Sequence, residues 1–104
     1  MGPHYLSRFF NPKSVAIIGA TERENSVGFR LMFNMQEAGF NGGLFPVNPK
    51  HEQILGLKAY PELMAIADDI DLVVIATPAS TVPAIMRQCG EKNVSSVIII
   101  SAGF

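Results

Sequence analysis

The chain has 104 residues, a formal net charge of −1 at pH 7 and 48% apolar residues. This length fits one domain with a core, and a near-neutral charge without a basic block argues against nucleic acid or an anionic membrane surface as a partner. The apolar runs are far too short to cross a bilayer, no secretory signal pattern opens the chain, and its single cysteine permits no internal disulfide, so we expect a cytoplasmic protein.

The first predicted elements are a strand and a helix. Residues 15–18 (VAII) are a continuous apolar run that ends at Gly19, a pattern typical of a parallel strand covered on both faces. Residues 28–38 repeat apolar side chains at helical spacing, with Ser26 or Asn25 available as the N-cap.

The middle of the chain is less regular. Residues 44–47 (LFPV) predict a second strand, which Pro46 keeps short because proline donates no hydrogen bond to a ladder. Residues 57–60 predict a short edge strand after a glycine. Pro61 then predicts the first residue of a helix.

The last third returns to clear alternation. Residues 72–76 (LVVIA) predict the clearest strand of the chain. A helix with apolar positions at helical spacing follows, with Ser80 or Thr81 as its cap. Residues 97–100 (VIII) predict the final strand.

This alternation predicts the fold class. Strand and helix repeats of this length imply right-handed crossovers, and therefore a parallel sheet with helices on both faces. We expect an α/β fold, a Rossmann-like three-layer sandwich with strand order 3-2-1-4-5. One domain would span residues 1–104, and we interpret it as a fragment of a larger multidomain protein.

Small or polar residues follow the predicted strands. In open parallel sheets the ligand binds beyond the carboxyl ends of the strands, and amides at a helix N-terminus hold phosphate. Ordinary turns and caps are the alternative interpretation of any single position. The candidate ligand-binding residues are Gly19, Ala20, Thr21, Ser26, Val27, Gly28, Val47, Asn48, Pro49, Lys50, Thr77, Pro78, Ala79, Ser101, Ala102 and Gly103.

Lys50 narrows the choice of ligand. The dinucleotide fingerprint G-x-G-x-x-G is absent, because the glycine after Gly19 comes only at Gly28. No acidic residue ends the second strand to bind a ribose 2′-hydroxyl. A lysine at this position suits a phosphate on the ribose, as in NADP or coenzyme A (CoA). A solvated surface charge is the other interpretation of Lys50.

Motifs along nearly the whole chain resemble one known family. They are FNPKSVAIIGAT (residues 10–21), SVG (26–28), FPVNPK (45–50), ILG (54–56), YP (60–61), DLVVIATPA (71–79) and ISAGF (100–104). In this order they resemble the N-terminal CoA-binding domain of ADP-forming acyl-CoA synthetases. They are similar, more distantly, to the α subunit of succinyl-CoA synthetase. The front end of protein lysine acetyltransferases that carry a synthetase-like region has a similar module.

The resemblance implies that CoA or acyl-CoA is the ligand and that the remaining synthetase domains, in cis or as a subunit, are the partners. It implies that the stretch from Ala20 to Gly28 meets the CoA phosphates and that residues 47–50 meet the adenosine end, with Lys50 near the 3′-phosphate. Pro78 and Ala79 would line the path of the ligand, and residues 101–103 its pantetheine arm. The chain departs from the family at residues 22–25 (EREN), where a proline is common; two glutamates there would repel a pyrophosphate.

No catalytic or metal-binding residue is predicted. His4 and His51 lack the partners of a nucleophile or base, Cys89 fits a packed helix face, and the acidic residues at 68, 69 and 71 fit a solvated turn. We therefore expect the chain alone to form no acyl-CoA. The alternatives are a non-enzymatic NAD(P)- or nucleotide-sensing Rossmann module and a scaffold domain that has lost its ligand.

Overall fold

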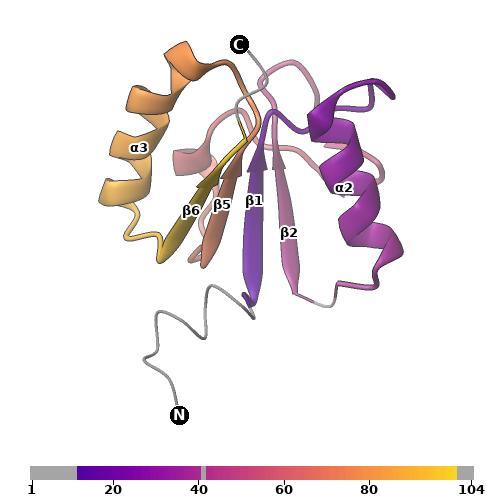
Figure 1. The fold of residues 1–104 in the computed structure, drawn as a ribbon. Helices are drawn as coiled ribbons and strands as arrows, with labels where there is room; N and C mark the ends of the chain where they lie inside the picture. Colours follow the sequence, from indigo (N-terminus) through magenta and orange to yellow (C-terminus); the bar gives the residue numbers. More distant parts are fainter. Residues whose placement is uncertain (1–11, 41, 101–104) are drawn as a thin grey trace.

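The computed structural model describes residues 12–40 and 42–100, which form a four-stranded parallel sheet in the order β2-β1-β5-β6. Two α-helices connect the strands (Figure 1). The principal elements are β1 (Ser14–Ile18), α2 (Val27–Glu37), β2 (Gly43–Val47), β5 (Leu72–Ile75), α3 (Val82–Glu91) and β6 (Ser96–Ile99). The predicted α/β class with a parallel sheet is confirmed.

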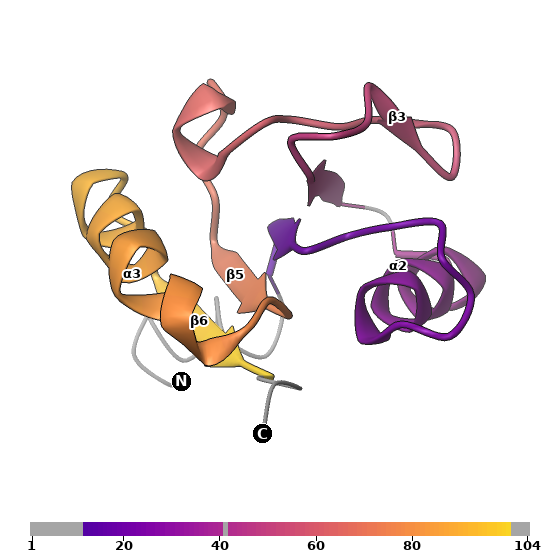
Figure 2. The same ribbon diagram turned by 90° about the horizontal axis from the view of Figure 1, so that it is seen from above.

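The sheet lies between α3 and α2, as the view along the strands shows (Figure 2). Alternate residues of a strand point to opposite faces, so β1 supplies both halves of the core. Ile17 packs with Met32 of α2, whereas Ile18 packs in the cluster that holds Cys89 of α3. Every residue of β1 after its first and every residue of β5 is buried. The three-layer arrangement and the core position of Cys89 are confirmed.

The predicted third strand, residues 57–60, is right only in part. The segment forms an antiparallel hairpin, β3 (Gln53–Ile54) with β4 (Leu57–Lys58), outside the main sheet. Only Tyr60 reaches that sheet, as an isolated parallel bridge to Val47. The order of the other four strands agrees with the prediction, and the third position is reduced to this one residue.

Pro46 lies within β2 without breaking it. Its carbonyl faces the outer edge, where it accepts a hydrogen bond from Tyr60 N at 2.9 Å. The next carbonyl, that of Val47, accepts from Gly19 N just past the end of β1 at 3.0 Å. The missing N–H of Pro46 therefore costs no bond to β1, which is how proline is tolerated on an edge strand.

The helix predicted from Pro61 is also wrong. Only one 3₁₀ turn forms, η1 (Leu63–Ala65). Leu63, Ile66 and Ile70 are buried in the core on the α3 side of the sheet, and Lys92 Nζ donates to the Ile66 carbonyl at 2.6 Å. The segment thus buries its apolar side chains without forming a helix, and the hydrogen bond from Lys92 holds it against α3.

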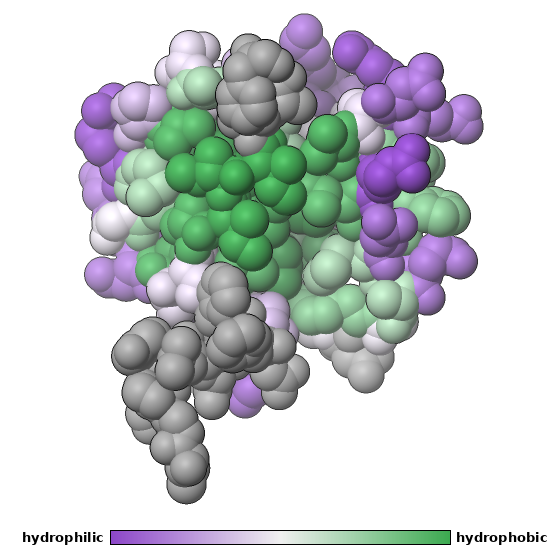
Figure 3. Space-filling view, in the orientation of Figure 1, coloured by the Kyte–Doolittle hydropathy of each residue, from purple (hydrophilic) through white to green (hydrophobic). Residues whose placement is uncertain are grey.

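One broad area of the surface is apolar. It lies between α3 and α2 on the face seen in Figure 3. The exposed apolar side chains at the β6 end of the sheet include Ile99 and Ile100. Among the described residues, no helix is long and apolar enough to span a membrane.

Candidate functional site

The carboxyl ends of three strands meet at one level. Gly19 N donates to Val47 O at 3.0 Å, and Ala76 N donates to Ile18 O at 2.9 Å. The parallel ladders therefore continue to the last residue of β1, β2 and β5. The segments that follow these strands start side by side, at the edge where open parallel sheets bind ligands.

Two glycines let the backbone close up at this edge. Gly19 has φ +93°, and a Cβ there would lie 2.9 Å from Thr77 Cγ2. A Cβ on Gly28 would lie 1.9 Å from the carbonyl oxygen of Gly19. Only glycine fits at either position, and the result is that the first turn of α2 sits directly on the end of β1.

The loop between β1 and α2, residues 21–26, is folded by its own hydrogen bonds. Ser26 is the N-cap, as predicted: its Oγ accepts from Phe29 N at 3.2 Å and donates to Arg23 O at 2.7 Å. Arg23 N in turn donates to Thr21 Oγ1 at 3.2 Å. These contacts leave the Arg23 side chain exposed beside the start of the helix.

Asn48 joins the end of β2 to its neighbours. Its Nδ2 donates to Ala20 O at 2.9 Å, and its Oδ1 accepts from Lys50 N at 2.8 Å. Its backbone N–H donates to Tyr60 O at 2.8 Å. The Asn48 side chain therefore stabilises the fold through these hydrogen bonds, and Lys50 lies on the exposed turn that follows.

The end of β5 turns into α3 through a short 3₁₀ turn, η2 (Ala79–Thr81). Thr81 occupies the N-cap position of α3, one of the two predicted, but its hydroxyl donates to Pro78 O at 2.7 Å and accepts no hydrogen bond from the helix. Since that hydroxyl has one proton, Thr77 Oγ1 is the donor of the 2.6 Å contact between the two hydroxyls. The turn thus holds Thr77 against the first residues of α3.

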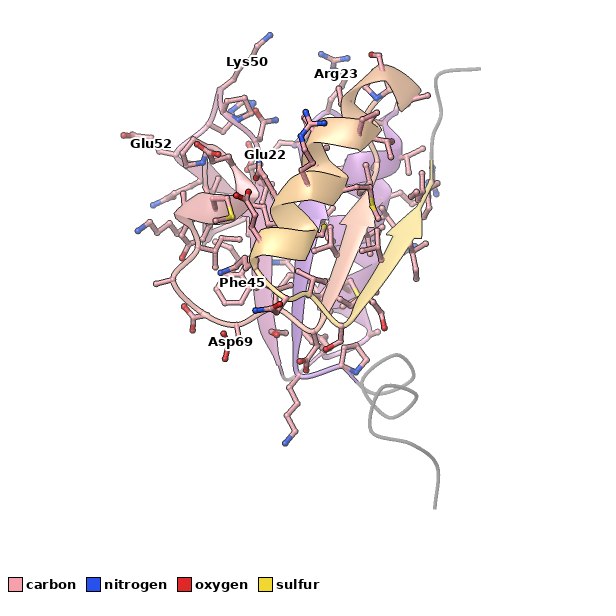
Figure 4. The ribbon with its side chains drawn as sticks, turned by 90° about the vertical axis from the view of Figure 1, so that its left-hand side faces the viewer. Glu22, Arg23, Phe45, Lys50, Glu52 and Asp69 are labelled. Atoms are coloured by element: carbon pink, nitrogen blue, oxygen red, sulfur yellow. The ribbon has the colours of Figure 1, made fainter. Side chains whose placement is uncertain are left out.

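These segments enclose a cavity of about 770 Å³. Arg23 and Lys50 rise from the same edge of the molecule, with Glu22 below them in this view (Figure 4). The cavity is lined by Ile18, Gly19, Thr21, Arg23, Ser26, Val47, Asn48, Pro49, Lys50, His51, Pro61, Glu62, Leu63, Ala76, Thr77, Pro78, Thr81, Ile85 and Gln88. The lining is largely apolar and carries two cations, Arg23 and Lys50, against one carboxylate, Glu62, a balance that suits an organic anion.

Most of the residues singled out from the sequence gather here. Those that line the cavity are Gly19, Thr21, Ser26, Val47, Asn48, Pro49, Lys50, Thr77 and Pro78. Val27 and Gly28 line a smaller cavity of about 500 Å³ beside it. Ala20 and Ala79 line neither; Ala20 is fully buried and contributes its carbonyl to Asn48. Residues 101–103 lie outside the described part of the chain, as does His4.

Sequence reasoning missed one wall of the cavity. Pro61 and Leu63 come from the irregular segment after Tyr60, and Ile85 and Gln88 come from α3. Helical spacing showed that α3 has an apolar face, but not that Ile85 and Gln88 border the cavity. The wall is made by packing between segments far apart in sequence, which no local pattern reports.

Two observations bear on metal binding and charge. Among the residues that the structure describes, no group of three or more His, Cys, Asp or Glu side chains is arranged to hold a metal ion. Asp71 Oδ2 accepts from Lys13 N at 2.9 Å, and Ser14 Oγ donates to Asp69 O at 2.9 Å. These acidic residues therefore hold the start of β1, at the end of the sheet opposite the cavity.

Known proteins resemble the chain along almost its whole length. The family model described as a CoA binding domain matches residues 13–104. An ADP-forming acetate–CoA ligase of Methanocaldococcus jannaschii is 47% identical over 93 residues, which are 89% of this chain and 13% of the relative. Acetate–CoA ligase [ADP-forming] II of Archaeoglobus fulgidus is 42% identical over 99 residues, 95% of this chain and 15% of the relative.

Solved structures agree with these sequence matches. The dinucleotide-forming acetyl-coenzyme A synthetase 1 of Candidatus Korarchaeum cryptofilum, in complex with phosphate and ADP, superimposes with a TM-score of 0.90 at 33% identity. The match covers 95% of this chain and 21% of that protein. The chain spans about a fifth or less of the length of these relatives. Because the family model matches nearly every described residue, the chain belongs to the CoA binding domain family.

Proposed function

We propose that the chain is the part of an ADP-forming acyl-CoA ligase that holds CoA for thioester formation. Family membership supports CoA as the ligand. The small share of each relative that the chain covers supports a larger parent with further synthetase domains. In this proposal the chain supplies only the CoA side of the reaction. The acid substrate of the parent is bound and selected outside the described cavity.

The end of β2 carries the proposal. A dinucleotide-binding Rossmann domain places an acidic side chain there for the ribose 2′-hydroxyl. Here the side chain is Asn48, whose amide is bonded to Ala20 O and Lys50 N. No carboxylate is available at this point, and a cation, Lys50, lines the cavity instead. This exchange favours a ribose that bears a phosphate.

The cavity fits CoA in three places. Lys50 is the residue for the 3′-phosphate, and Arg23 with the amides at the start of α2 is placed for the pyrophosphate. The absence of a Cβ at Gly19 and Gly28 lets the start of α2 pack directly on the end of β1, which brings those amides to the carboxyl edge of the sheet. Thr77 and Pro78 continue the path toward the reacting end. When bound, CoA supplies the thiol that receives the acyl group.

Calorimetric titration with CoA and with dephospho-CoA tests the proposal. Lys50→Ala should weaken CoA binding about tenfold or more, the value of one charge-assisted hydrogen bond, and leave dephospho-CoA binding unchanged. Lys13→Ala is the matched control, since Lys13 is exposed at the opposite end of the sheet. Equal affinity of the wild-type chain for the two ligands would remove the role given to Lys50.

A sensing module for NAD(P) or another nucleotide is the competing function. Thermal-shift measurements with NAD, NADP, CoA and acetyl-CoA separate the two, because at equal concentration the ligand that binds more tightly raises the melting temperature more. We expect CoA and acetyl-CoA to give the larger shifts. Greater stabilisation by NAD than by CoA would favour the sensing module.

A further inference from the structure

Glu22 lies in the β1–α2 loop but turns away from the cavity. Its neighbours Thr21 and Arg23 line the cavity, and Glu22 does not. Its Oε2 accepts a hydrogen bond from Leu55 N at 2.7 Å. The two residues are 33 positions apart in the sequence, so this contact ties the loop to the β3–β4 hairpin.

The hairpin is a firm anchor for this contact. Leu55 and Gly56 form its turn with φ 50° and 84°, a pair of left-handed residues that fixes a tight two-residue turn. Ile54 is fully buried in the core on the α2 side. Gln36 Nε2 of α2 donates to Leu55 O at 3.1 Å. The Leu55 N–H is thus presented to Glu22 from a position held by the core and by α2.

Hydrogen bonds hold the loop on both sides of Arg23. Arg23 follows it directly, and the Arg23 carbonyl accepts from both Oγ and N of Ser26, at 2.7 Å and 3.1 Å. One end of the loop is therefore fixed by the helix cap and the other by Glu22. We propose that Glu22 is a positioning residue, which acts through the Leu55 amide to hold Arg23 and the cap amides toward the phosphates of CoA. This inference rests on the proposed function.

A glutamate in this loop can affect CoA binding in two opposite ways. A free carboxylate near the phosphates would repel them, so its removal should tighten binding. A carboxylate that holds the loop should have the opposite effect, because its removal releases Arg23. Glu24, which is exposed in the same loop, carries the same charge and provides the comparison. Repulsion predicts that removing either glutamate tightens CoA binding, whereas positioning predicts that removing Glu22 alone weakens it.

Four variants of the chain test this by calorimetric titration with CoA. Glu22→Ala should weaken binding about threefold to tenfold, the range for one typical net intramolecular hydrogen bond. Glu22→Gln should bind within about twofold of wild type or more tightly, since an amide oxygen also accepts from Leu55 N. Glu24→Ala should bind as tightly as wild type or more so. Gln36→Ala should lower the melting temperature and weaken CoA binding less than Glu22→Ala does, because Leu55 is still held by the buried Ile54 and by Glu22 itself.

Hydrogen exchange at Leu55 supplies a readout without CoA. The amide should exchange faster in Glu22→Ala than in wild type and be protected again in Glu22→Gln. Equal CoA affinities of Glu22→Ala and Glu24→Ala would overturn the inference, as would Glu22→Gln binding as weakly as Glu22→Ala. A greater loss of affinity in Gln36→Ala than in Glu22→Ala would place the effect in the hairpin and contradict the role of Glu22. Wild-type chain that binds no CoA would instead refute the proposed function.

Discussion

Gly28→Ala adds a single methyl group at the tightest contact of the site. The new Cβ would lie 1.9 Å from the Gly19 carbonyl oxygen, whereas real Cβ atoms essentially never approach within 3.0 Å of a neighbour. The start of α2 or the end of β1 must therefore move by more than an ångström, and neither is a flexible side chain. Overpacking of this kind costs about 1–3 kcal/mol, which exceeds the roughly 0.5–1 kcal/mol that alanine gains over glycine in a helix.

Gly90→Ala is the matched substitution in the other helix. Nothing lies within 4 Å of a Cβ at Gly90, so there alanine should stabilise by about 0.5–1 kcal/mol. Thermal unfolding followed by circular dichroism should show a midpoint about 5–15 °C lower for Gly28→Ala and a few degrees higher for Gly90→Ala. The affinity of Gly28→Ala for CoA should also fall, because the cap amides move with the helix. A Gly28→Ala midpoint at or above that of wild type would refute the close-approach argument.

Two further predictions concern Asn48 and Cys89. Asn48→Asp replaces the donor to Ala20 O with a carboxylate facing a carbonyl, so urea unfolding should show a loss of about 1–3 kcal/mol, and an unchanged midpoint would contradict the bond. Burial raises the pKa of the Cys89 thiol above its ordinary value of 9.0. The stability that the buried neutral thiol contributes is therefore complete below pH 9 and is lost as the pH rises through the pKa of the folded state. The decline of the urea midpoint above pH 9 should therefore be shallower in Cys89→Ala; equal slopes would contradict this.

The central strands could be predicted because burial on both faces leaves a simple pattern. Residues 15–18 and 72–75 are apolar at every position, and both runs lie inside the sheet. The start of α2 was also readable, because Ser26 has the residue type and spacing of an N-cap. In these cases a local sequence signal and the tertiary environment favour the same structure.

The hairpin was missed because its turn lacks the usual residues. Two-residue hairpin turns favour Asn-Gly or Asp-Gly, since both central residues need positive φ. Here Leu55 occupies the first position with φ 50°, and nothing in its residue type signals this. Its contacts with Glu22 and Gln36 support that conformation, and both come from distant parts of the chain.

The segment after Pro61 was misread for a different reason. Leu63, Ile66 and Ile70 recur at intervals of three and four, the spacing of a helix face. The structure buries all three along an irregular path in the core on the α3 side. Periodicity reports which residues face a core, and a short segment pressed against other elements can satisfy it without forming a helix.

Part of the candidate site could be predicted from local sequence patterns, and part could not. Strand ends are local features, so Gly19, Asn48 and Thr77 could be singled out from the sequence and do gather at one cavity. The direction of a charged side chain is not a local feature. Arg23 and Glu22 are adjacent, yet one lines the cavity and the other accepts from Leu55, a difference fixed by the hairpin.

The strand order also sets the sequence in which the domain can fold. β1 lies between β2 and β5, so one of its ladders has no partner until the chain has been synthesised past Leu72. Non-local parallel pairing of this kind is slow, because loop-closure entropy is lost before the contacts form. At about 5–20 residues per second on the ribosome, the apolar β1 waits for seconds with only β2 beside it. During that interval the emerging chain is at its most vulnerable to mispairing and aggregation.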